Sequence, residues 1–327
     1  MKYFSAILAA IILFFNSTAD AKFKLPAPNP TTEFEKLDFA PVYPTYSWEP
    51  LANTEFYLVQ VLNSEGKIIR ELMNNEALNR VTDAQPFNEV GKYYWRVCVV
   101  DKNKNQLSEW SEQKLIEVTA PVTFAALGDS ITHGGANFIP AGQISCQWET
   151  YCQYKIKNIG RSGDTTAMMI ERFERDVLPF SPKVLIIMGG VNDIRIGLTA
   201  DEVINNLKIL RDKCLANDIV PIFCTLTPMN DEIMARRGIP FKKSWKVERK
   251  KINDRILKND GVDFETWLED ENGELRADFT PDGLHPDMRG KMVIGSTIEK
   301  FLAEHWFNFI TGNEIKGWAF VRVSSES

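Results

Sequence analysis

The sequence predicts an α/β protein, a doubly wound, mostly parallel sheet preceded by an N-terminal all-β sandwich domain. Two observations support this prediction. From residue 121 onward, short apolar runs of strand length alternate with longer runs in which apolar residues recur every three or four positions, as expected when helices cover both faces of a parallel sheet. Between residues 45 and 119, apolar and polar residues alternate in short runs separated by turn-forming residues, a pattern typical of antiparallel sandwiches.

Length and composition fit this two-domain organisation. The chain has 327 residues, of which 44% are hydrophobic and 25% charged, and its formal net charge is −6. No basic block is present, so no nucleic-acid partner is expected. The five cysteines are odd in number and match no zinc spacing, and the sequence has no convincing cluster of metal ligands. No metal and no cofactor is expected. A disulfide between Cys146 and Cys152 and a set of buried free thiols are both compatible with the pattern.

Residues 1–21 have the pattern of a secretory signal peptide. Lys2 precedes an apolar run from Phe4 to Phe15, and a small-x-small sequence ends at Ala21. The run is too short to span a bilayer comfortably, and no later stretch approaches spanning length. We therefore expect a secreted or periplasmic protein, cleaved near Ala21, with no integral membrane segment after signal removal.

Residues 22–44 are rich in Pro, Asn and Thr without a sustained period, so a linker is expected there. The sandwich is expected at 45–119. Its strongest strand contains Trp95. The alternation of side chains along this strand directs Trp95 into the core and places Cys98 on the outer face. Three segments resemble a fibronectin type III domain, namely Tyr46-Ser47-Trp48, Gly91 to Val97 and Ser108 to Ser111. The resemblance implies a sugar-binding module or a spacer, and we favour the spacer.

The second domain is expected at 120–306, with a C-terminal tail at 307–327. Strands are expected at 122–127, 156–159, 184–188, 219–226 and 262–264. Helices are expected at 148–154, 165–178 and 199–216, within 241–258, and at 286–305. The continuous apolar run 184–188 suits a strand buried on both faces, and Thr199 with Glu202 forms a capping box. A strand around 318–323 is compatible with the tail.

Polar segments follow four of the predicted strands. Ser130 comes after the first strand, 158–164 after the second, 189–193 after the third, and Asp282 with His285 after the fifth. The carboxyl ends of parallel strands meet at one edge of the sheet, where ligands bind. Each segment also has a purely structural interpretation, such as a turn, a helix cap or a buried histidine. Their coincidence in this order favours a functional site.

The same segments resemble the four sequence blocks of the SGNH (GDSL) hydrolases. The matching residues are Gly128-Asp129-Ser130-Ile131-Thr132-His133-Gly134, Gly160 with Gly163, Gly190-Val191-Asn192-Asp193 and Asp282-Gly283-Leu284-His285. The resemblance covers about 121–305 and implies an SGNH/flavodoxin-like fold. It also implies that Ser130 is the nucleophile, His285 the base and Asp282 its orienting acid. The oxyanion hole would consist of the backbone N–H groups of Ser130 and Gly163 and the side chain of Asn192.

We therefore expect a secreted serine esterase that removes small acyl groups, acetyl above all, through an acyl-enzyme on Ser130. Its substrate would be a small ester or an acylated carbohydrate. The alternatives are a lysophospholipase or thioesterase-type lipid acylhydrolase, and a binding protein whose hydrolase domain is inert.

We expect His133 to face solvent near the pocket mouth, and Trp148 and Met229 to pack in the core rather than line an acyl pocket. Segment 227–246 is a candidate rim loop. Because every expected catalytic residue follows residue 121, the first domain should be dispensable for a small soluble ester.

Overall fold

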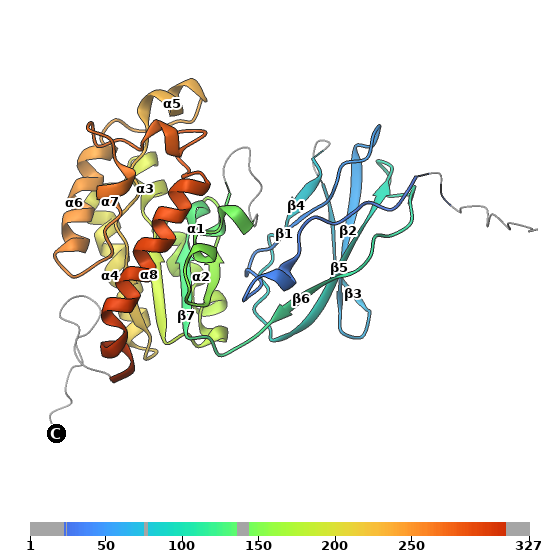
Figure 1. Ribbon diagram of the computed structural model, residues 1–327, viewed down its shortest axis with the longest axis horizontal. Coiled ribbons are helices and arrows are strands. Elements are labelled where there is room, and N and C mark those ends of the chain that lie inside the picture. Colours follow the sequence, from blue (N-terminus) through green and yellow to red (C-terminus); the bar gives the residue numbers. More distant parts are fainter. Residues whose placement is uncertain (1–22, 24, 75–77, 136–143, 312–327) are drawn as a thin grey trace, which may run out of the picture.

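The computed structural model describes residue 23 and residues 25–74, 78–135 and 144–311. Within these ranges an antiparallel β region precedes an α/β region, and the two lie side by side (Figure 1). The predicted signal peptide and the segment 318–323 lie outside the described residues. No helix in the described ranges combines the length and the apolar character needed to cross a membrane.

The N-terminal β region contains two antiparallel sheets. One has the strand order β3-β2-β5-β6, and the other pairs β1 with β4. The bounds are β1 Thr45–Ser47, β2 Phe56–Asn63, β3 Ile68–Met73, β4 Arg80–Thr82, β5 Gly91–Val100 and β6 Lys114–Val118. Trp95 is fully buried as predicted, with its ring 5.1 Å from that of Tyr46. Cys98 is also fully buried, in a separate small cluster covered by Trp110. Cys98 thus lies on the face of β5 opposite Trp95, as predicted, but side chains from neighbouring segments cover that face.

The α/β region is built on a parallel sheet with the strand order β10-β9-β7-β8. Its strands are β7 Phe124–Gly128, β8 Ile156–Gly160, β9 Val184–Met188 and β10 Val220–Phe223. The predicted fifth strand is reduced to one parallel bridge between Cys224 and Val262. Because the chain leaves β7 first to one side and then to the other, the carboxyl end of β7 is a topological switch point, the usual position of a ligand site.

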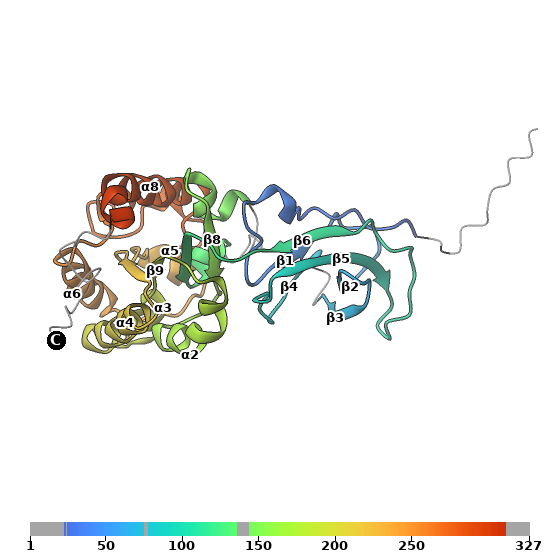
Figure 2. The same cartoon turned by 90° about the horizontal axis from the view of Figure 1, so that it is seen from below.

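Helices cover both faces of this sheet. The bounds are α1 Ser130–His133, α2 Thr166–Asp176, α3 Val191–Ile196, α4 Ala200–Leu215, α5 Asp231–Arg236, α6 Trp245–Leu257, α7 Glu265–Leu268 and α8 Met288–Thr311. Helix α8 lies on one side of the sheet, and α2 and α4 lie on the other (Figure 2). The segment predicted as a helix at 148–154 is a short 3-10 helix, Trp148–Tyr151, and α8 continues beyond the predicted boundary at 306. The doubly wound arrangement is thus present.

The segment before β1 is packed rather than extended between domains. Leu25 pairs with Ser108, so its first part lies along the sandwich. Further on, Ala40, Val42 and Tyr43 are buried, with exposed fractions of 3% or less. The N–H of Val42 donates to the carbonyl of Asn158 on β8 at 3.1 Å. This segment therefore closes the free edge of the parallel sheet.

Candidate active site

The turn after β7 places Ser130 at the carboxyl end of the central strand. Oδ1 of Asp129 accepts the N–H of Ile131 at 2.9 Å and so caps α1, as is usual for Asp at a helix start. Gly128 has no room for a side chain, since a Cβ would lie 2.8 Å from the carbonyl oxygen of Met188 on the neighbouring strand. The tight turn therefore fixes the position of Ser130, which is partly exposed.

Ser130, His285 and Asp282 form one hydrogen-bonded line. Oγ of Ser130 lies 2.9 Å from Nε2 of His285, and Nδ1 of His285 lies 2.8 Å from Oδ2 of Asp282. Asp282 is fully buried, whereas Ser130 is partly open to solvent. This order of hydroxyl, imidazole and carboxylate can activate the hydroxyl as a nucleophile.

The charge of Asp282 is held by hydrogen bonds. Burial by itself would raise its pKa, but hydrogen bonds from the His285 side chain and from the backbone N–H groups of His285 and Leu284 bring the pKa below its ordinary value. Asp282 is therefore an anion at neutral pH. A carboxylate facing Nδ1 keeps the proton on that nitrogen, so the lone pair of Nε2 faces Ser130.

The turn that carries Asp282 and His285 is braced from two sides. Oγ1 of Thr280 donates to the carbonyl of His285 at 2.9 Å and accepts the N–H of Gly283 at 2.8 Å. From the other side, the N–H of Asn230 donates to the carbonyl of Gly283 at 2.7 Å, and Asn230 also caps α5. Segment 227–246, the predicted rim loop, thus contacts the turn through Asn230.

The loop 161–164 and Asn192 meet beside the nucleophile turn. Nδ2 of Asn192 donates to the carbonyl of Asp164 at 2.9 Å, while Oδ1 of Asn192 accepts from Arg195 at 3.3 and 3.4 Å. The amide orientation is therefore fixed, and one N–H of Nδ2 remains for another acceptor.

Gly163 has φ +87°, a conformation that favours glycine, and a Cβ there would meet no atom within 4 Å. The glycine is thus needed for the backbone conformation rather than for a close contact with the protein.

Comparison with known proteins agrees with this geometry. Residues 126–293, more than half of the chain, match the GDSL-like lipase/acylhydrolase family. The chain belongs to this family. It is a serine hydrolase that acts on carboxylic ester bonds. No protein of curated function matches the sequence.

Several solved structures are similar in part. A GDSL-like lipase from Bacteroides thetaiotaomicron is 22% identical, with 56% of this chain and 88% of that chain covered and a TM-score of 0.46. An acylhydrolase described as putative, from Bacteroides fragilis, is 23% identical, with 63% and 89% covered and a TM-score of 0.42. A catalytic mutant of an acetylxylan esterase from Geobacillus stearothermophilus is 20% identical, with 63% and 99% covered and a TM-score of 0.39.

Other predicted positions of this GDSL-like hydrolase are settled by burial. His133 is 1% exposed, so the prediction that it faces solvent is wrong, because the segment before β1 covers it. Trp148 and Met229 are fully buried and belong to the core, as favoured. All five cysteines are free thiols, so Cys146 and Cys152 do not form a disulfide. In the described part of the chain, no group of three or more His, Cys, Asp and Glu side chains is arranged to hold a metal ion.

Sequence reasoning missed a buried charged group behind the nucleophile helix of this hydrolase. Nζ of Lys291, fully buried on α8, donates to the carbonyl of Ile131. Burial lowers the pKa of Lys291 to about 8 and raises that of Glu149 to about 7 and that of Asp129 to about 6. A signal existed in the sequence, because Lys291 lies on the same helical stripe as Ile294, Ile298 and Leu302.

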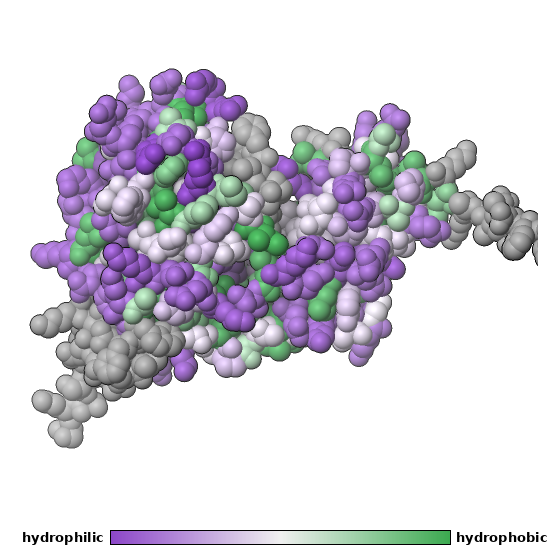
Figure 3. Space-filling model, viewed as in Figure 1, coloured by the Kyte–Doolittle hydropathy of each residue, from purple (hydrophilic) through white to green (hydrophobic). Residues whose placement is uncertain are grey.

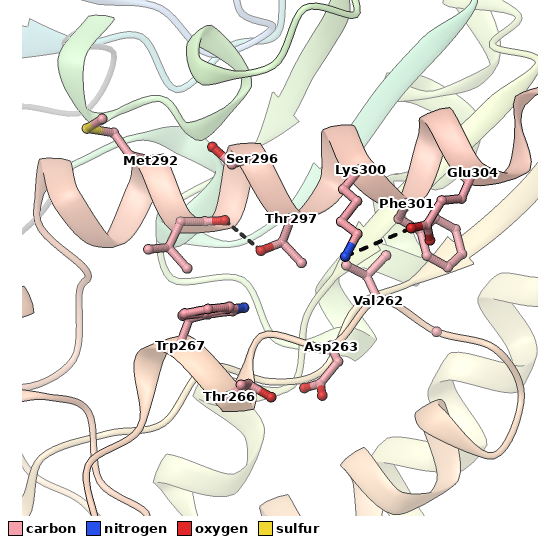
Figure 4. A pocket seen from close by; sticks show the side chains of 12 residues that line it. Val262, Asp263, Thr266, Trp267, Met292, Ser296, Thr297, Lys300, Phe301 and Glu304 are labelled. Carbon is pink, nitrogen blue, oxygen red and sulfur yellow. Dashed lines mark hydrogen bonds and ion pairs between the residues drawn. The ribbon is translucent and has the colours of Figure 1, made fainter.

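A large groove lies elsewhere in the α/β region. It has a volume of about 640 Å³ and runs between α7 and α8, beside Trp267, whose side chain is 60% exposed (Figure 4). None of the residues of the Ser130–His285–Asp282 line borders it. The face of the molecule seen in Figure 3 is mostly hydrophilic, with separate small hydrophobic patches. The candidate active site is therefore identified by its hydrogen bonds and not by the size of a cavity.

Proposed function

We propose that this protein is an exported esterase that removes small acyl groups, acetyl above all, from an acylated carbohydrate or another small ester. The observation that carries the proposal is the hydrogen-bonded line from Ser130 through His285 to the buried Asp282, with contacts of 2.9 and 2.8 Å. These distances are within the range expected of a nucleophile and its base.

The proposed reaction proceeds in two steps. Oγ of Ser130 attacks the carbonyl carbon of the ester while Nε2 of His285 takes the hydroxyl proton. The tetrahedral intermediate then collapses, the C–O bond to the alcohol breaks, and His285 returns the proton to the leaving alcohol. In the second step His285 removes a proton from water, which attacks the acyl-enzyme and releases the carboxylic acid and Ser130. Asp282 remains an anion throughout and stabilises the imidazolium.

The negative charge on the carbonyl oxygen requires hydrogen-bond donors already in place. We assign this role to the backbone N–H groups of Ser130 and Gly163 and to the remaining N–H of Asn192. Support comes from the contact between Nδ2 of Asn192 and the carbonyl of Asp164, because it holds the Asn192 side chain against loop 161–164, which contains Gly163. Loss of one such donor typically lowers the rate by about 100- to 1,000-fold.

A short acyl group on a hydrophilic alcohol fits the surroundings of Ser130. Trp148 and Met229, the two side chains considered for an acyl pocket, are part of the core. Next to the nucleophile turn, Arg161, Ser162 and Gly163 are exposed, so the surface there is polar. Carbohydrate is a matching substrate because its hydroxyl groups can bind such a surface, whereas a long acyl chain would need a buried apolar channel.

The N-terminal β region is proposed as a fibronectin type III-like spacer. Its pairing of a four-stranded sheet with a two-stranded sheet, and the burial of Tyr46, Trp48 and Trp95 between them, support the resemblance. The boundaries at 45–119 and 120–306 remain predictions, and so does export. N-terminal sequencing of mature protein from the periplasm or medium should start near Lys22; a chain that retains Met1 would contradict export.

An ester panel tests the substrate class. We expect p-nitrophenyl acetate and acetylated oligosaccharides to be hydrolysed with a higher kcat/KM than long-chain p-nitrophenyl esters or lysophospholipids. A fluorophosphonate probe should label the wild type and not Ser130→Ala. Preference for lysophospholipids would instead identify a lipid acylhydrolase. A folded wild type that neither turns over esters nor reacts with the probe would indicate a binding protein.

A further inference from the structure

Tyr43 connects the N-terminal segment to the α/β region at the edge of its sheet. Its side chain is 1% exposed. The residues around it are fixed to β8, since the carbonyl of Ala40 accepts Nζ of Lys157 at 2.6 Å and the N–H of Val42 bonds to Asn158. The carbonyl of Val42 in turn accepts the N–H of Phe87 from the N-terminal β region at 2.8 Å. Tyr43 is thus held by both regions.

A first chain of hydrogen bonds leads from the backbone of Tyr43 to loop 161–164. The carbonyl of Tyr43 lies 2.6 Å from Nε2 of His133, and Nδ1 of His133 lies 3.2 Å from the backbone nitrogen of Ser162 and 2.9 Å from its Oγ. A backbone N–H can only donate, so Nδ1 is the acceptor and Nε2 carries the proton that it donates to Tyr43. The imidazole therefore fixes Ser162, the residue whose carbonyl shares a peptide bond with the N–H of Gly163.

The neutral form of His133 suits this role. Burial lowers its pKa to about 4, and the nearby positive charges of Arg172 and Lys291 act in the same direction. At any pH above about 5 the ring keeps one proton, so the acceptor at Nδ1 is preserved.

A second route leads from the hydroxyl of Tyr43 to the other end of the loop. This hydroxyl donates to Oδ2 of Asp176 at 2.6 Å and accepts from Arg175 at 2.7 Å. Asp176 also binds Arg172, whose Nε donates to Oδ2 of Asp164 at 2.5 Å.

Arg172 extends this route to the nucleophile turn. Its Nη2 donates to the carbonyl of Gly128 at 3.1 Å. The side chains of Arg172, Asp164 and Asp176 are 2% exposed or less, so the orientation of each one depends on the others.

We propose that Tyr43 is a positioning residue for the oxyanion hole. It holds loop 161–164 at Ser162 through His133 and at Asp164 through Asp176 and Arg172. The active site of this hydrolase is therefore complete only when the segment before β1 is docked. This inference rests on the proposed role of Gly163 and Asn192 as oxyanion donors. It also reverses the expectation that residues 22–119 are dispensable, because their deletion removes Tyr43.

Full-length Tyr43→Phe and His133→Phe test the proposal, with Tyr46→Phe as a matched control. Tyr46 is also fully buried and its hydroxyl also donates to a buried carboxylate, that of Asp83 at 3.3 Å, but inside the N-terminal β region. On p-nitrophenyl acetate we expect Tyr43→Phe to lower kcat about 5- to 20-fold and His133→Phe by more, with KM changed less than about twofold. Tyr46→Phe should lose comparable thermal stability and keep wild-type kcat.

Two further measurements separate positioning from a merely structural contact. The backbone amide resonances of Ser162 and Gly163 should shift in Tyr43→Phe and in His133→Phe but not in Tyr46→Phe, and this readout does not depend on activity. In a double-mutant cycle, Tyr43→Phe should cost less when Asn192 is already Ala, since the loop then serves a damaged oxyanion hole.

The two hypotheses fail in different ways. A wild type inactive on all esters would contradict the proposed function, and unmoved loop resonances in both Tyr43→Phe and His133→Phe would then still overturn the positioning role. An active wild type with unchanged kcat in folded Tyr43→Phe and His133→Phe proteins would show that Tyr43 only joins the two regions, because the first variant removes the hydroxyl route and the second removes the route from the backbone carbonyl.

Discussion

Replacing Asn192 tests the oxyanion hole directly. In the structure Nδ2 of Asn192 uses one N–H for the carbonyl of Asp164 at 2.9 Å, and Arg195 holds Oδ1 at 3.3 and 3.4 Å. Asn192→Ala removes the donor, whereas Asn192→Asp keeps the shape and the contact with Arg195. Gly190 is the N-cap of α3, and Asn192 lies inside the helix. A simple capping role for Asn192, in which Asp would substitute freely, is therefore excluded.

The expected magnitudes follow from these contacts. The Ala variant should lose on the order of 3 kcal/mol of transition-state stabilisation, or about 100- to 1,000-fold in kcat, with KM nearly unchanged. The Asp variant should be at least as slow, because a carboxylate oxygen would face both the carbonyl of Asp164 and the developing oxyanion. The retained contact with Arg195 should nevertheless keep its thermal stability at or above that of the Ala variant.

Steady-state kinetics on p-nitrophenyl acetate decides between these outcomes, with Ser130→Ala as the background and thermal unfolding as the control for folding. A folded Asn192→Asp enzyme with kcat within about tenfold of wild type would refute the reasoning, since neither its charge nor its lost donor should permit this rate.

Three other perturbations have defined outcomes. Ser130→Ala should abolish ester hydrolysis and fluorophosphonate labelling while circular dichroism stays unchanged; residual turnover near wild type would remove the nucleophile assignment. Asp282→Asn should lower kcat by about four orders of magnitude at neutral pH, because the amide no longer selects the productive tautomer, and an active variant would contradict that role. For His133, burial beside Arg172 and Lys291 lowers the pKa to about 4 from its ordinary 6.5, so the unfolded chain binds the proton first as pH falls and stability decreases from pH 6.5 to 4. Denaturant titrations should show about 3 kcal/mol of this loss in the wild type and not in His133→Gln, and equal slopes in both would contradict the shift.

The elements and the main site residues could be predicted because their signals are local. The apolar runs at β7, β8 and β9 have strand length, and parallel strands bring their carboxyl ends together whatever the loop lengths between them. Ser130, Asn192 and His285 each follow such a strand or lie in a short motif.

The positions that were mispredicted depend on contacts between distant parts of the chain. His133 was expected in solvent because nothing in its neighbourhood indicates that Tyr43, 90 residues earlier, covers it. Residues 22–44 have no period, so their sequence could not show that they close the edge of β8. The position of Lys291 on the apolar stripe of α8 could have been predicted from the sequence, but its hydrogen bond to the carbonyl of Ile131 could not.

The sequence alone thus predicted the fold class, the four strands of the parallel sheet, the hydrolase family and the candidate residues Ser130, His285 and Asp282, since each depends on periodicity or on a short motif. The tertiary structure alone decided how loop 161–164 is held. The bond from Tyr43 to Asp176 spans 133 positions, and that from His133 to Ser162 spans 29. Both contacts require that the segment before β1 lies against the edge of β8, and no local pattern of residues encodes that packing.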